Sequence, residues 1–493
     1  MSFLRAILRA HDAVSALVVC MAATATAVLS CSSEEPAGSS SFSRPNPRPP
    51  VGDDDDEPGT SSSGGLPPAR DAETLQLAQI VAGTHHTCVR WSDGVVKCWG
   101  SNYTGQLGLG DTNPRGDDPE GMGRALPMVD MGTGARASEI GAGGASTCAL
   151  LVDGKVKCWG RNAFGGLGQP DEEPRGDSPE SMGDALLPID LGTNRIAKTL
   201  GVGDFSACAL LNDSAVKCWG SNFGGELGYG DDRQRGGDPT DPDVLPMGDA
   251  LPPIDIGLSN IQTISMTAAV AYQSGCAIAA NGSMKCWGGN NYGQLGIGDT
   301  ENRGDDPAEM GGQLPRVPLG ENALLSIPGH DAMCVVLDTG QLRCWGRNEY
   351  GQLGQGDVAL RGHNGDNLPL VNLASGSKII HASMYDHTCT VFQDRTVKCW
   401  GRNDAGQLGL GDTEHRGDAA GEMGTALPAL DLGNDAPLEI ACGERHTCAR
   451  FASNKVKCWG SNDAGQLGYG DTVARGATPG TMGQALPYVD LGR

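Results

Sequence analysis

The stretch VKCWGSNYTGQLGLGDT at residues 96–112 decides the fold, because nearly the same phrase returns six more times. Its Cys-Trp-Gly triplet recurs with spacings of 55–68 residues, at Cys98, Cys158, Cys218, Cys286, Cys344, Cys399 and Cys458. Self-similarity at such a period indicates structural units that bury their apolar faces against one another. The sequence therefore predicts an array of seven units.

One period contains a strand that ends near Ala-Gly, a hairpin around a turn such as Asp153-Gly154, a long loop and a Leu-Pro segment. Four short strands per period predict an all-β, seven-bladed β-propeller with four-stranded antiparallel blades. The 75 glycines and 5% aromatic residues fit short strands and turns better than long helices. Because short connections join neighbours, we assign each Leu-Pro segment to the blade that follows it. Residues 486–491 would then complete the first blade and close the ring.

The core W-G-x-N-x-x-G-Q-L-G at residues 99–108, with Ala-Gly-x-x-His-Thr before it at 82–87, resembles the repeat of the regulator of chromosome condensation family. The resemblance extends over all seven copies and implies a seven-bladed propeller. It does not fix an activity, because proteins of this family include nucleotide exchange factors, light sensors and enzyme inhibitors.

The N-terminal segment is typical of an export signal. Arg5 and Arg9 precede an apolar run that ends in Val28-Leu29-Ser30-Cys31 and resembles the lipobox of bacterial lipoproteins. We expect a signal peptide at 1–30, lipidation of Cys31, a disordered Ser/Pro/Asp-rich tether at 31–72 and the propeller at 73–493. The expected location is the cell envelope, at the outer membrane or cell surface, or outside the cell. An ordinary signal peptide or an uncleaved anchor is the alternative.

Fourteen cysteines form pairs ten residues apart, each pair straddling a hairpin turn, which would place them opposite each other on adjacent strands. In an exported chain these pairs predict intrablade disulfides. The pairs are Cys88/Cys98, Cys148/Cys158, Cys208/Cys218, Cys276/Cys286, Cys334/Cys344, Cys389/Cys399 and Cys448/Cys458. Metal binding with the histidines of the His-x-Cys motifs is the alternative, but four of the seven copies lack that histidine. Cys442 has no counterpart and is expected to be a buried free thiol.

Two further features recur in every copy. The tryptophan after the second cysteine, Trp99 in the first copy, is expected to fill the wedge between blades.

The second feature is an aspartate followed four residues later by an arginine, which predicts a clasp within or between loops. The pairs are Asp111/Arg115, Asp171/Arg175, Asp231/Arg235, Asp299/Arg303, Asp357/Arg361, Asp412/Arg416 and Asp471/Arg475. Calcium binding is the alternative, but calcium needs several converging oxygens and each arginine opposes it.

The net charge and the motifs of the sequence limit the classes of function that are expected. A net charge of -24 argues against a nucleic-acid partner, and no nucleophile and base stand at a known motif spacing. We expect no enzyme activity, cofactor or metal, and a monomer whose only membrane contact is its lipid anchor. The favoured function is a module that binds an unknown protein partner through loops on one face. The alternatives are an inhibitor of an extracellular enzyme and a guanine-nucleotide exchange factor.

Overall fold

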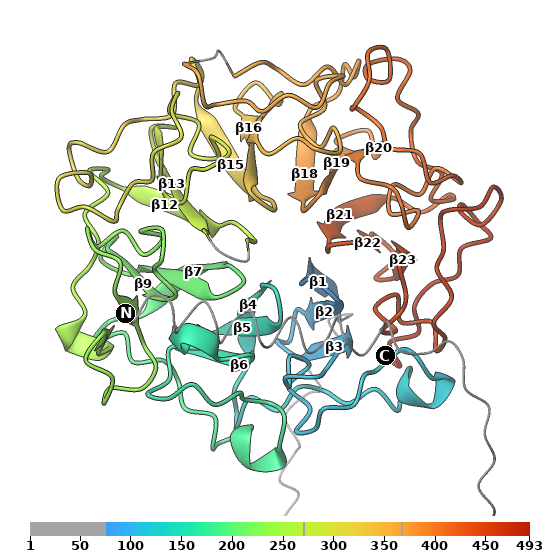
Figure 1. Ribbon diagram of the computed structural model, residues 1–493. Helices are drawn as coiled ribbons and strands as arrows, with labels where there is room; N and C mark the ends of the chain where they lie inside the picture. The colour runs from blue at the N-terminus through green and yellow to red at the C-terminus, as the bar shows by residue number, and fades with distance from the viewer. Residues whose placement is uncertain (1–74, 270–271, 366–367) are drawn as a thin grey trace, which may run out of the picture. The chain divides into compact units, whose positions relative to one another are not determined.

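The computed structural model describes residues 75–269, 272–365 and 368–493, and the expected signal peptide and tether lie outside this range. Seven sheets follow one another in chain order around a ring (Figure 1). Neighbouring blades are in contact all the way round, including the first with the seventh through β1 and β21. The chain is therefore a seven-bladed β-propeller, as predicted. In the part described, no helix is both long and apolar enough to cross a membrane.

Each blade begins with an inner strand at the centre of the ring and continues outward through a hairpin (Figure 1). The inner strands are β1 (Leu77–Ala82), β4 (Ala137–Ala142), β7 (Ala197–Val202), β12 (Ile261–Met266), β15 (Ala323–Pro328), β18 (Ile379–Met384) and β21 (Pro437–Cys442). The second strands are β2 (His86–Trp91), β5 (Ser146–Leu151), β8 (Ser206–Leu211), β13 (Ser274–Ala279), β16 (Ala332–Leu337), β19 (His387–Phe392) and β22 (His446–Phe451). The third strands are β3 (Val96–Gly100), β6 (Val156–Gly160), β9 (Val216–Gly220), β14 (Met284–Gly288), β17 (Leu342–Gly346), β20 (Val397–Gly401) and β23 (Val456–Gly460).

The third blade carries two additional short strands, β10 (Gln234–Arg235) and β11 (Val244–Leu245), in the insertion after β9. Four short 3-10 helices lie in the long loops: η1 (Pro119–Gly121), η2 (Ala163–Gly165), η3 (Pro179–Ser181) and η4 (Gly248–Ala250).

The predicted four-stranded blade is wrong, because the regular blade has three strands and the Leu-Pro segment forms no ladder within the described residues. In the first blade, the outer edge of β3 is shared by two separate segments. Arg115 forms a single antiparallel bridge with Gly100, and the Val129 N–H donates to the Val96 carbonyl oxygen at 2.9 Å. A continuous fourth strand cannot form there, since Pro127 has no N–H and Asp130 bonds the Gly132 N–H in a local turn.

The hydrophobic core is divided among the seven junctions between blades. Each cluster combines side chains of two neighbouring blades around one tryptophan, as Cys98 and Val96 of the first blade pack with Ile140 and Trp159 of the second. Every such indole also donates from Nε1, over 2.9–3.2 Å, to a backbone carbonyl of the preceding blade. The tryptophans therefore join blades by packing and by hydrogen bonding.

Buried lysines of the third strands also link neighbouring blades. Lys157 donates to the carbonyl oxygens of Gly183, in the loop of its own blade, and of Met131, in the segment from the blade before. The same two-sided contact occurs at Lys97, Lys217, Lys398 and Lys457. Each ammonium thus satisfies two carbonyls that would otherwise be buried without a donor.

The last segment lies at the junction of the seventh and first blades and does not complete the first blade as predicted. Its regular backbone bond goes to the seventh blade, from the Val489 N–H to the Val456 carbonyl oxygen at 2.8 Å. Its Leu491 carbonyl accepts from Lys97 of the first blade, and Val489 and Leu491 share a core cluster with Trp99. Ring closure therefore uses the same lysine and tryptophan contacts as most of the other junctions.

Candidate functional site

One end of the propeller, which we call the turn face, carries most of the differences between blades. It is formed by two sets of turns: the mouth turns, which join each inner strand to the second strand, and the rim loops, which follow each third strand. The two sets are adjacent because β2 and β3 run antiparallel; in the first blade the Ser101 N–H of the rim loop donates to the His85 carbonyl of the mouth turn.

Backbone hydrogen bonds connect several mouth turns to one another around the centre of the ring. The Glu444 N–H of the seventh blade donates to Thr84, and the Thr84 N–H donates onward to Gly144 of the second blade. On the opposite side, the His330 N–H of the fifth blade donates to the carbonyl oxygen of Tyr385 in the sixth. These bonds hold the mouth turns of different blades in fixed positions relative to one another.

A chain of ion pairs crosses the turn face over the fifth, sixth and seventh blades. Asp386 is at its centre, with its carboxylate 3.0 Å from His330 Nδ1, 3.3 Å from Arg402 Nη1 and 3.9 Å from Arg347 Nη1. Arg402 also pairs with Asp404 at 3.0 Å. This arrangement spans three blades, so it can stabilise their relative positions.

The chain of ion pairs extends to the first blade. Glu444 lies 3.8 Å from Arg402 and 3.4 Å from His85 Nε2. Burial would raise the pKa of Asp386, but the hydrogen bond from His330 and the charges of the two arginines outweigh it and hold that pKa below its ordinary value. The Asp386 carboxylate is therefore the fixed anion of this sector.

The opposite sector of the turn face is aromatic. Phe164 packs edge to face on Phe205 and Phe223, with ring centroids 5.7 and 5.1 Å apart, and the Arg161 guanidinium lies 4.7 Å from the centre of the Phe205 ring. Phe223 is 40% exposed. Phe164 has a φ of 60°, a left-handed conformation that is rare for an aromatic residue. An exposed aromatic cluster with a cation beside it has the composition of a protein-binding patch.

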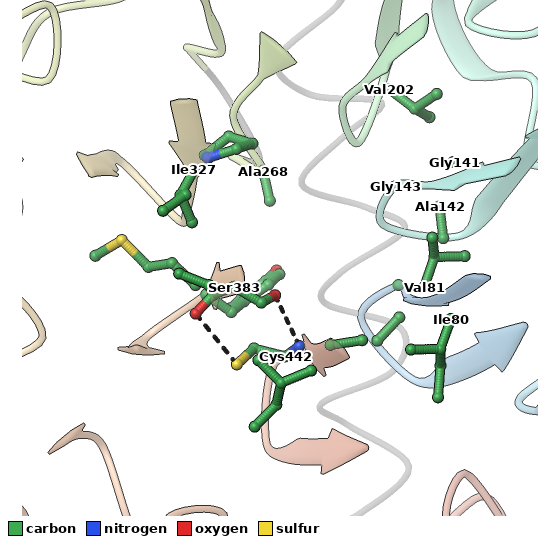
Figure 2. Close-up of a pocket in the computed structure, with 18 of the residues that line it drawn as sticks. Ile80, Val81, Gly141, Ala142, Gly143, Val202, Ala268, Ile327, Ser383 and Cys442 are labelled. Carbon is green, nitrogen blue, oxygen red and sulfur yellow. Dashed lines mark hydrogen bonds between the residues drawn. The ribbon is translucent and has the colours of Figure 1, made fainter. Parts of the chain in front are cut away.

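The seven cysteine pairs predicted from spacing are disulfides in the structure. Each joins facing residues of the second and third strands, such as Cys88 and Cys98, with Cα–Cα distances of 4.0–4.1 Å. Cys442 is a free, buried thiol whose Sγ donates to the Ser383 carbonyl oxygen at 3.4 Å (Figure 2). Burial raises the pKa of this thiol to about 12.

The histidines of the His-x-Cys motifs contact threonines of the next blade. Nε2 of His86 lies 2.9 Å from the Thr147 hydroxyl, and Nε2 of His387 lies 2.7 Å from the Thr447 hydroxyl. Burial lowers the pKa of these imidazoles, to about 3 for His86 and about 4 for His387. Of the described residues, His387, Cys389 and Cys442 are close enough to share a metal ion, but Cys389 is bound to Cys399 in a disulfide.

All seven aspartate–arginine pairs form within a single loop rather than between loops, with nitrogen–oxygen distances of 2.6–2.8 Å. They are Asp111/Arg115, Asp171/Arg175, Asp231/Arg235, Asp299/Arg303, Asp357/Arg361, Asp412/Arg416 and Asp471/Arg475. The amide of an asparagine in the repeat core completes each clasp. Asn102 Nδ2 donates to the Asp111 carbonyl oxygen at 2.7 Å, and Asn102 Oδ1 accepts from the Leu107 N–H.

The arginines also make a backbone contact that the predicted clasp did not include. Each arginine also pairs through its backbone with the glycine that ends the third strand of its own blade, so it belongs to the edge of the sheet. The single antiparallel bridges are Arg115 with Gly100, Arg175 with Gly160, Arg303 with Gly288, Arg361 with Gly346, Arg416 with Gly401 and Arg475 with Gly460. In the third blade the equivalent pair, Arg235 with Gly220, lies where β10 joins β9.

The physical reason for this bridge is the reversal of the chain between the glycine and the arginine. In the first blade the Gly100 N–H donates to the Arg115 carbonyl oxygen at 2.8 Å, and the Arg115 N–H donates back to Gly100 at 3.1 Å. The clasp with Asp111 holds the loop in the conformation that brings these two backbone groups together. The arginine side chains are accordingly 3–21% exposed, whereas their aspartate partners are 32–44% exposed.

The mouth-turn residues were missed by the sequence reasoning, which searched for features that recur. At the position of Thr84, the other blades carry Gly144, Asp204, His330, Tyr385 and Glu444, and the fourth blade has a longer turn. Aligning the repeats on their cysteines and asking where they differ would have found this position. The linking lysine was also missed, although it precedes the second cysteine in six of the seven copies.

Comparison with known proteins agrees with this architecture. The family model described as the RCC1-like domain matches residues 50–423, and models of the regulator of chromosome condensation repeat match residues 397–450 and 439–466. The chain belongs to the RCC1-like domain family. The yeast RCC1 (Prp20) structure solved with Kap60 superposes with a TM-score of 0.59 at 18% identity, over 87% of this chain and 90% of that one.

Relatives of this RCC1-like chain have different functions. The ultraviolet-B receptor UVR8 of Arabidopsis thaliana is 29% identical over 404 residues, covering 80% of this chain and 79% of the receptor. The E3 ubiquitin-protein ligase HERC2 of Mus musculus is 26% identical over 386 residues, which are 77% of this chain and 7% of the ligase. The match to proteins of such different functions therefore indicates the fold and does not indicate an activity.

Proposed function

We propose that this RCC1-like propeller is a non-catalytic module that binds a protein partner through its turn face. The observation that carries the proposal is where the repeats differ. Their cysteines, tryptophans, lysines and clasps recur because the ring needs them, whereas the mouth-turn position changes from Thr84 to Asp204, His330 and Tyr385 in other blades. Structural demands are similar in every blade, so differences that concentrate on one face point to recognition there.

The chemistry of the turn face supports a protein as the partner. Exposed aromatic rings provide binding energy when they are covered, and Phe223 and Tyr272 are 40% and 38% exposed. The neighbouring ion-pair sector around Asp386 would provide orientation and selectivity through complementary charge. A yeast relative of this fold has been crystallised with the protein Kap60, so RCC1-like propellers can bind protein partners.

We also propose that the protein works outside the cytosol, anchored by a lipid on Cys31. Seven disulfides favour an oxidising compartment. The lipobox-like end of the N-terminal apolar run supplies the attachment site, and the acidic, Ser/Pro-rich stretch after it would separate the propeller from the membrane.

Affinity capture from envelope extracts tests the first proposal. Phe223→Asp places a charge in the aromatic sector and should abolish capture of the partner that the unchanged protein retains. The matched control is Val152→Asp, because Val152 is 70% exposed at a hairpin turn on the opposite end of the blade. Equal capture by both variants would place the binding surface elsewhere.

Membrane fractionation tests the second proposal. Cys31→Ala should release the protein from membranes or block its processing, while a change of Cys442 to Ala should leave fractionation as it was. Unchanged membrane association of the Cys31→Ala protein, with a cleaved N-terminus, would exclude a lipid anchor at this residue.

A further inference from the structure

The inner strands surround a cavity of about 290 Å³ at the centre of the ring (Figure 2). Polar and apolar groups both line it, and its apolar side chains come from different blades: Ile80 from the first, Val202 from the third, Met266 from the fourth, Ile327 from the fifth and Met384 from the sixth. The volume is close to the lower end of the range of about 300–1,000 Å³ that is usual for small-molecule sites.

One carboxylate in the lining has no counter-ion in the part of the chain that the structure describes. Asp204, in the mouth turn of the third blade, is 8% exposed, and its Oδ1 has no hydrogen-bond partner among the described residues. Its side chain lies against Gly144, where the absence of a Cβ leaves room for it. By contrast, the other carboxylate of the lining, Glu439, accepts from Arg450 Nε at 2.7 Å and from the Ile80 N–H at 3.2 Å.

Among the described residues, the cations near Asp204 make other contacts. Arg161 lies within electrostatic reach of Asp204, and its guanidinium is 4.7 Å from the centre of the Phe205 ring. His330 directs Nδ1 to Asp386 at 3.0 Å and Nε2 to Asp331 at 3.8 Å. Arg347 and Arg402 pair with Asp386 and with acids of their own rim loops. A buried carboxylate without a cation is costly, and a bound cation would remove that cost.

We infer that this cavity binds a primary ammonium group on an unbranched alkyl chain, with the ammonium at Asp204. An ammonium is a compact charge that one free carboxylate can bind, whereas a guanidinium is matched by a pair of oxygens. The apolar side chains of the lining suit methylene groups. They do not suit an inorganic divalent cation, because such an ion needs about six oxygen ligands. The group can belong to a free alkylamine or to a lysine side chain of a protein. The cavity shares Asp204 and Tyr385 with the mouth turns of the turn face, but binding of an amine there does not require a protein partner on the exposed surface.

The proposed contact also predicts how binding depends on pH. Burial raises the pKa of Asp204 to about 6. This value includes the charges of Asp331 and Glu444, which also raise the pKa, and the effects of His330 and the Gly144 N–H, which lower it; Tyr385 and Arg161 also lie within the electrostatic reach of Asp204. The alkylammonium stays charged over this range, so binding should weaken as the pH falls through about 6 and Asp204 takes up its proton.

Binding can be followed through the methionine methyl groups that line the cavity, with n-pentylamine as the probe. In protein labelled with ¹³C at the methionine methyls, n-pentylamine should shift the Met266 and Met384 signals in a saturable way at pH 7.5. The Met128 signal should not move, because Met128 is 56% exposed and does not line the cavity. The uncharged analogue 1-pentanol should bind at least about tenfold more weakly, because it lacks the charged hydrogen bond.

Two variants and one peptide complete the test. Asp204→Asn should weaken pentylamine binding about tenfold or more, while the turn-face control Asp463→Asn should not. If Asp204→Asn does not fold, the loss of binding below pH 6 in the unchanged protein serves as the test. A capped Gly-Lys-Gly peptide that shifts the same methyls, when its norleucine analogue does not, would identify lysine as the source of the amine. Shifts with pentylamine alone would identify a free amine. Equal binding of pentanol and pentylamine, or no shift at 10 mM of either, would overturn the inference and leave water at Asp204.

Discussion

Lys97 donates to the carbonyl oxygen of Leu491 across 2.8 Å, although 394 residues separate the two along the chain. The same ammonium donates to Gly123 at 3.2 Å, within its own blade. The ring is therefore closed by a buried charge that bridges two backbone segments, together with the packing around Trp99. A β-strand ladder between the first and last blades is not involved.

Replacing Lys97 by Met should destabilise the whole propeller. The methionine keeps the apolar stem but leaves two buried carbonyls without a donor, and a hydrogen bond to a charged group contributes about 1.5–3 kcal/mol. We expect a loss of about 2 kcal/mol or more in urea unfolding. The control is Lys155→Met, since Lys155 is 60% exposed and pairs only with Asp153 in a hairpin turn. Similar unfolding midpoints for the two variants would contradict the bridging role.

Removing residues 486–493 should lower stability more than any single substitution in that segment. The deletion takes away Leu486, Val489 and Leu491, which are all buried, as well as the acceptor of Lys97. Thermal unfolding should show a large fall in Tm and lower cooperativity. Arg493→Ala, which removes the side-chain contacts with Asp93, Trp91 and Met128 but none of the buried residues, should change Tm by a few degrees at most. A truncated protein that melts with the full-length one would show that the ring closes without this segment.

The buried histidines should make the propeller sensitive to acid. The pKa of His86 is about 3 in the folded protein, against about 6.5 when unfolded. Between these values only the unfolded chain binds the proton, so stability falls as the pH drops from about 6.5 toward 3. His86→Ser introduces the serine that occupies the equivalent positions 146, 206 and 274 of other blades. It should reduce the slope of unfolding free energy against pH by about 1.4 kcal/mol per pH unit.

A second variant, Thr147→Val, separates the effect of protonating His86 from the effect of losing its hydrogen bond to Thr147. This variant removes the partner of His86 but keeps the imidazole, so it should cost about 1 kcal/mol and retain the acid sensitivity. If His86→Ser and the parent protein lose stability in parallel between pH 6.5 and 4, the imidazole does not titrate as its burial requires.

A peptide map of residues 75–493 under non-reducing conditions should contain seven links between cysteines ten residues apart and one free thiol, Cys442. Each bridge closes a small loop, worth about 2–3 kcal/mol by chain entropy. The double change Cys334→Ala and Cys344→Ala should therefore lower stability by about that amount, beyond the packing lost. Cys442→Ala should leave the sensitivity to reductant unchanged. Free thiols at the paired positions would refute the disulfide framework.

The sequence was a good guide to features that every blade needs. Spacing alone indicated the number of blades, the hairpins and the facing positions of Cys88 and Cys98. Each blade packs against neighbours of the same kind, so the residues that make these contacts recur at the same place in every repeat. The sequence failed as a guide at the outer edge, where Leu-Pro segments looked like strands. Whether Val129 continues a ladder depends on two local events, the missing N–H of Pro127 and the turn at Asp130, and neither follows from hydrophobic pattern.

The aspartate–arginine clasps also show which contacts at the outer edge of a blade could not be predicted from the sequence. The spacing of Asp171 and Arg175 predicted that their side chains would pair, and they do. It could not predict that the Arg175 backbone would bridge Gly160, because that contact depends on how the whole loop between them turns back.

The candidate site was harder to predict for the opposite reason. Asp204, His330 and Tyr385 are far apart in the chain and share no residue type, so no motif contains them. They come together because each occupies the same place in a different blade. The role of Lys97 was missed for another reason. A lysine in a short strand is expected to face solvent unless the strand is known to be covered on both sides.

The junction that closes the ring has the same form as most of the others, so the chain has no preferred starting point. Lys97 and Leu491 meet at the junction of the first and seventh blades as Lys157 and Met131 meet between the first and second. Five residues lead from Met131 to Ala137, and Gly492, Arg493, Leu75 and Gln76 would fill nearly the same gap between Leu491 and Leu77. A circular permutant joined there by one added residue and opened before Ala197 should fold to the same ring, with blade order relabelled and every contact kept.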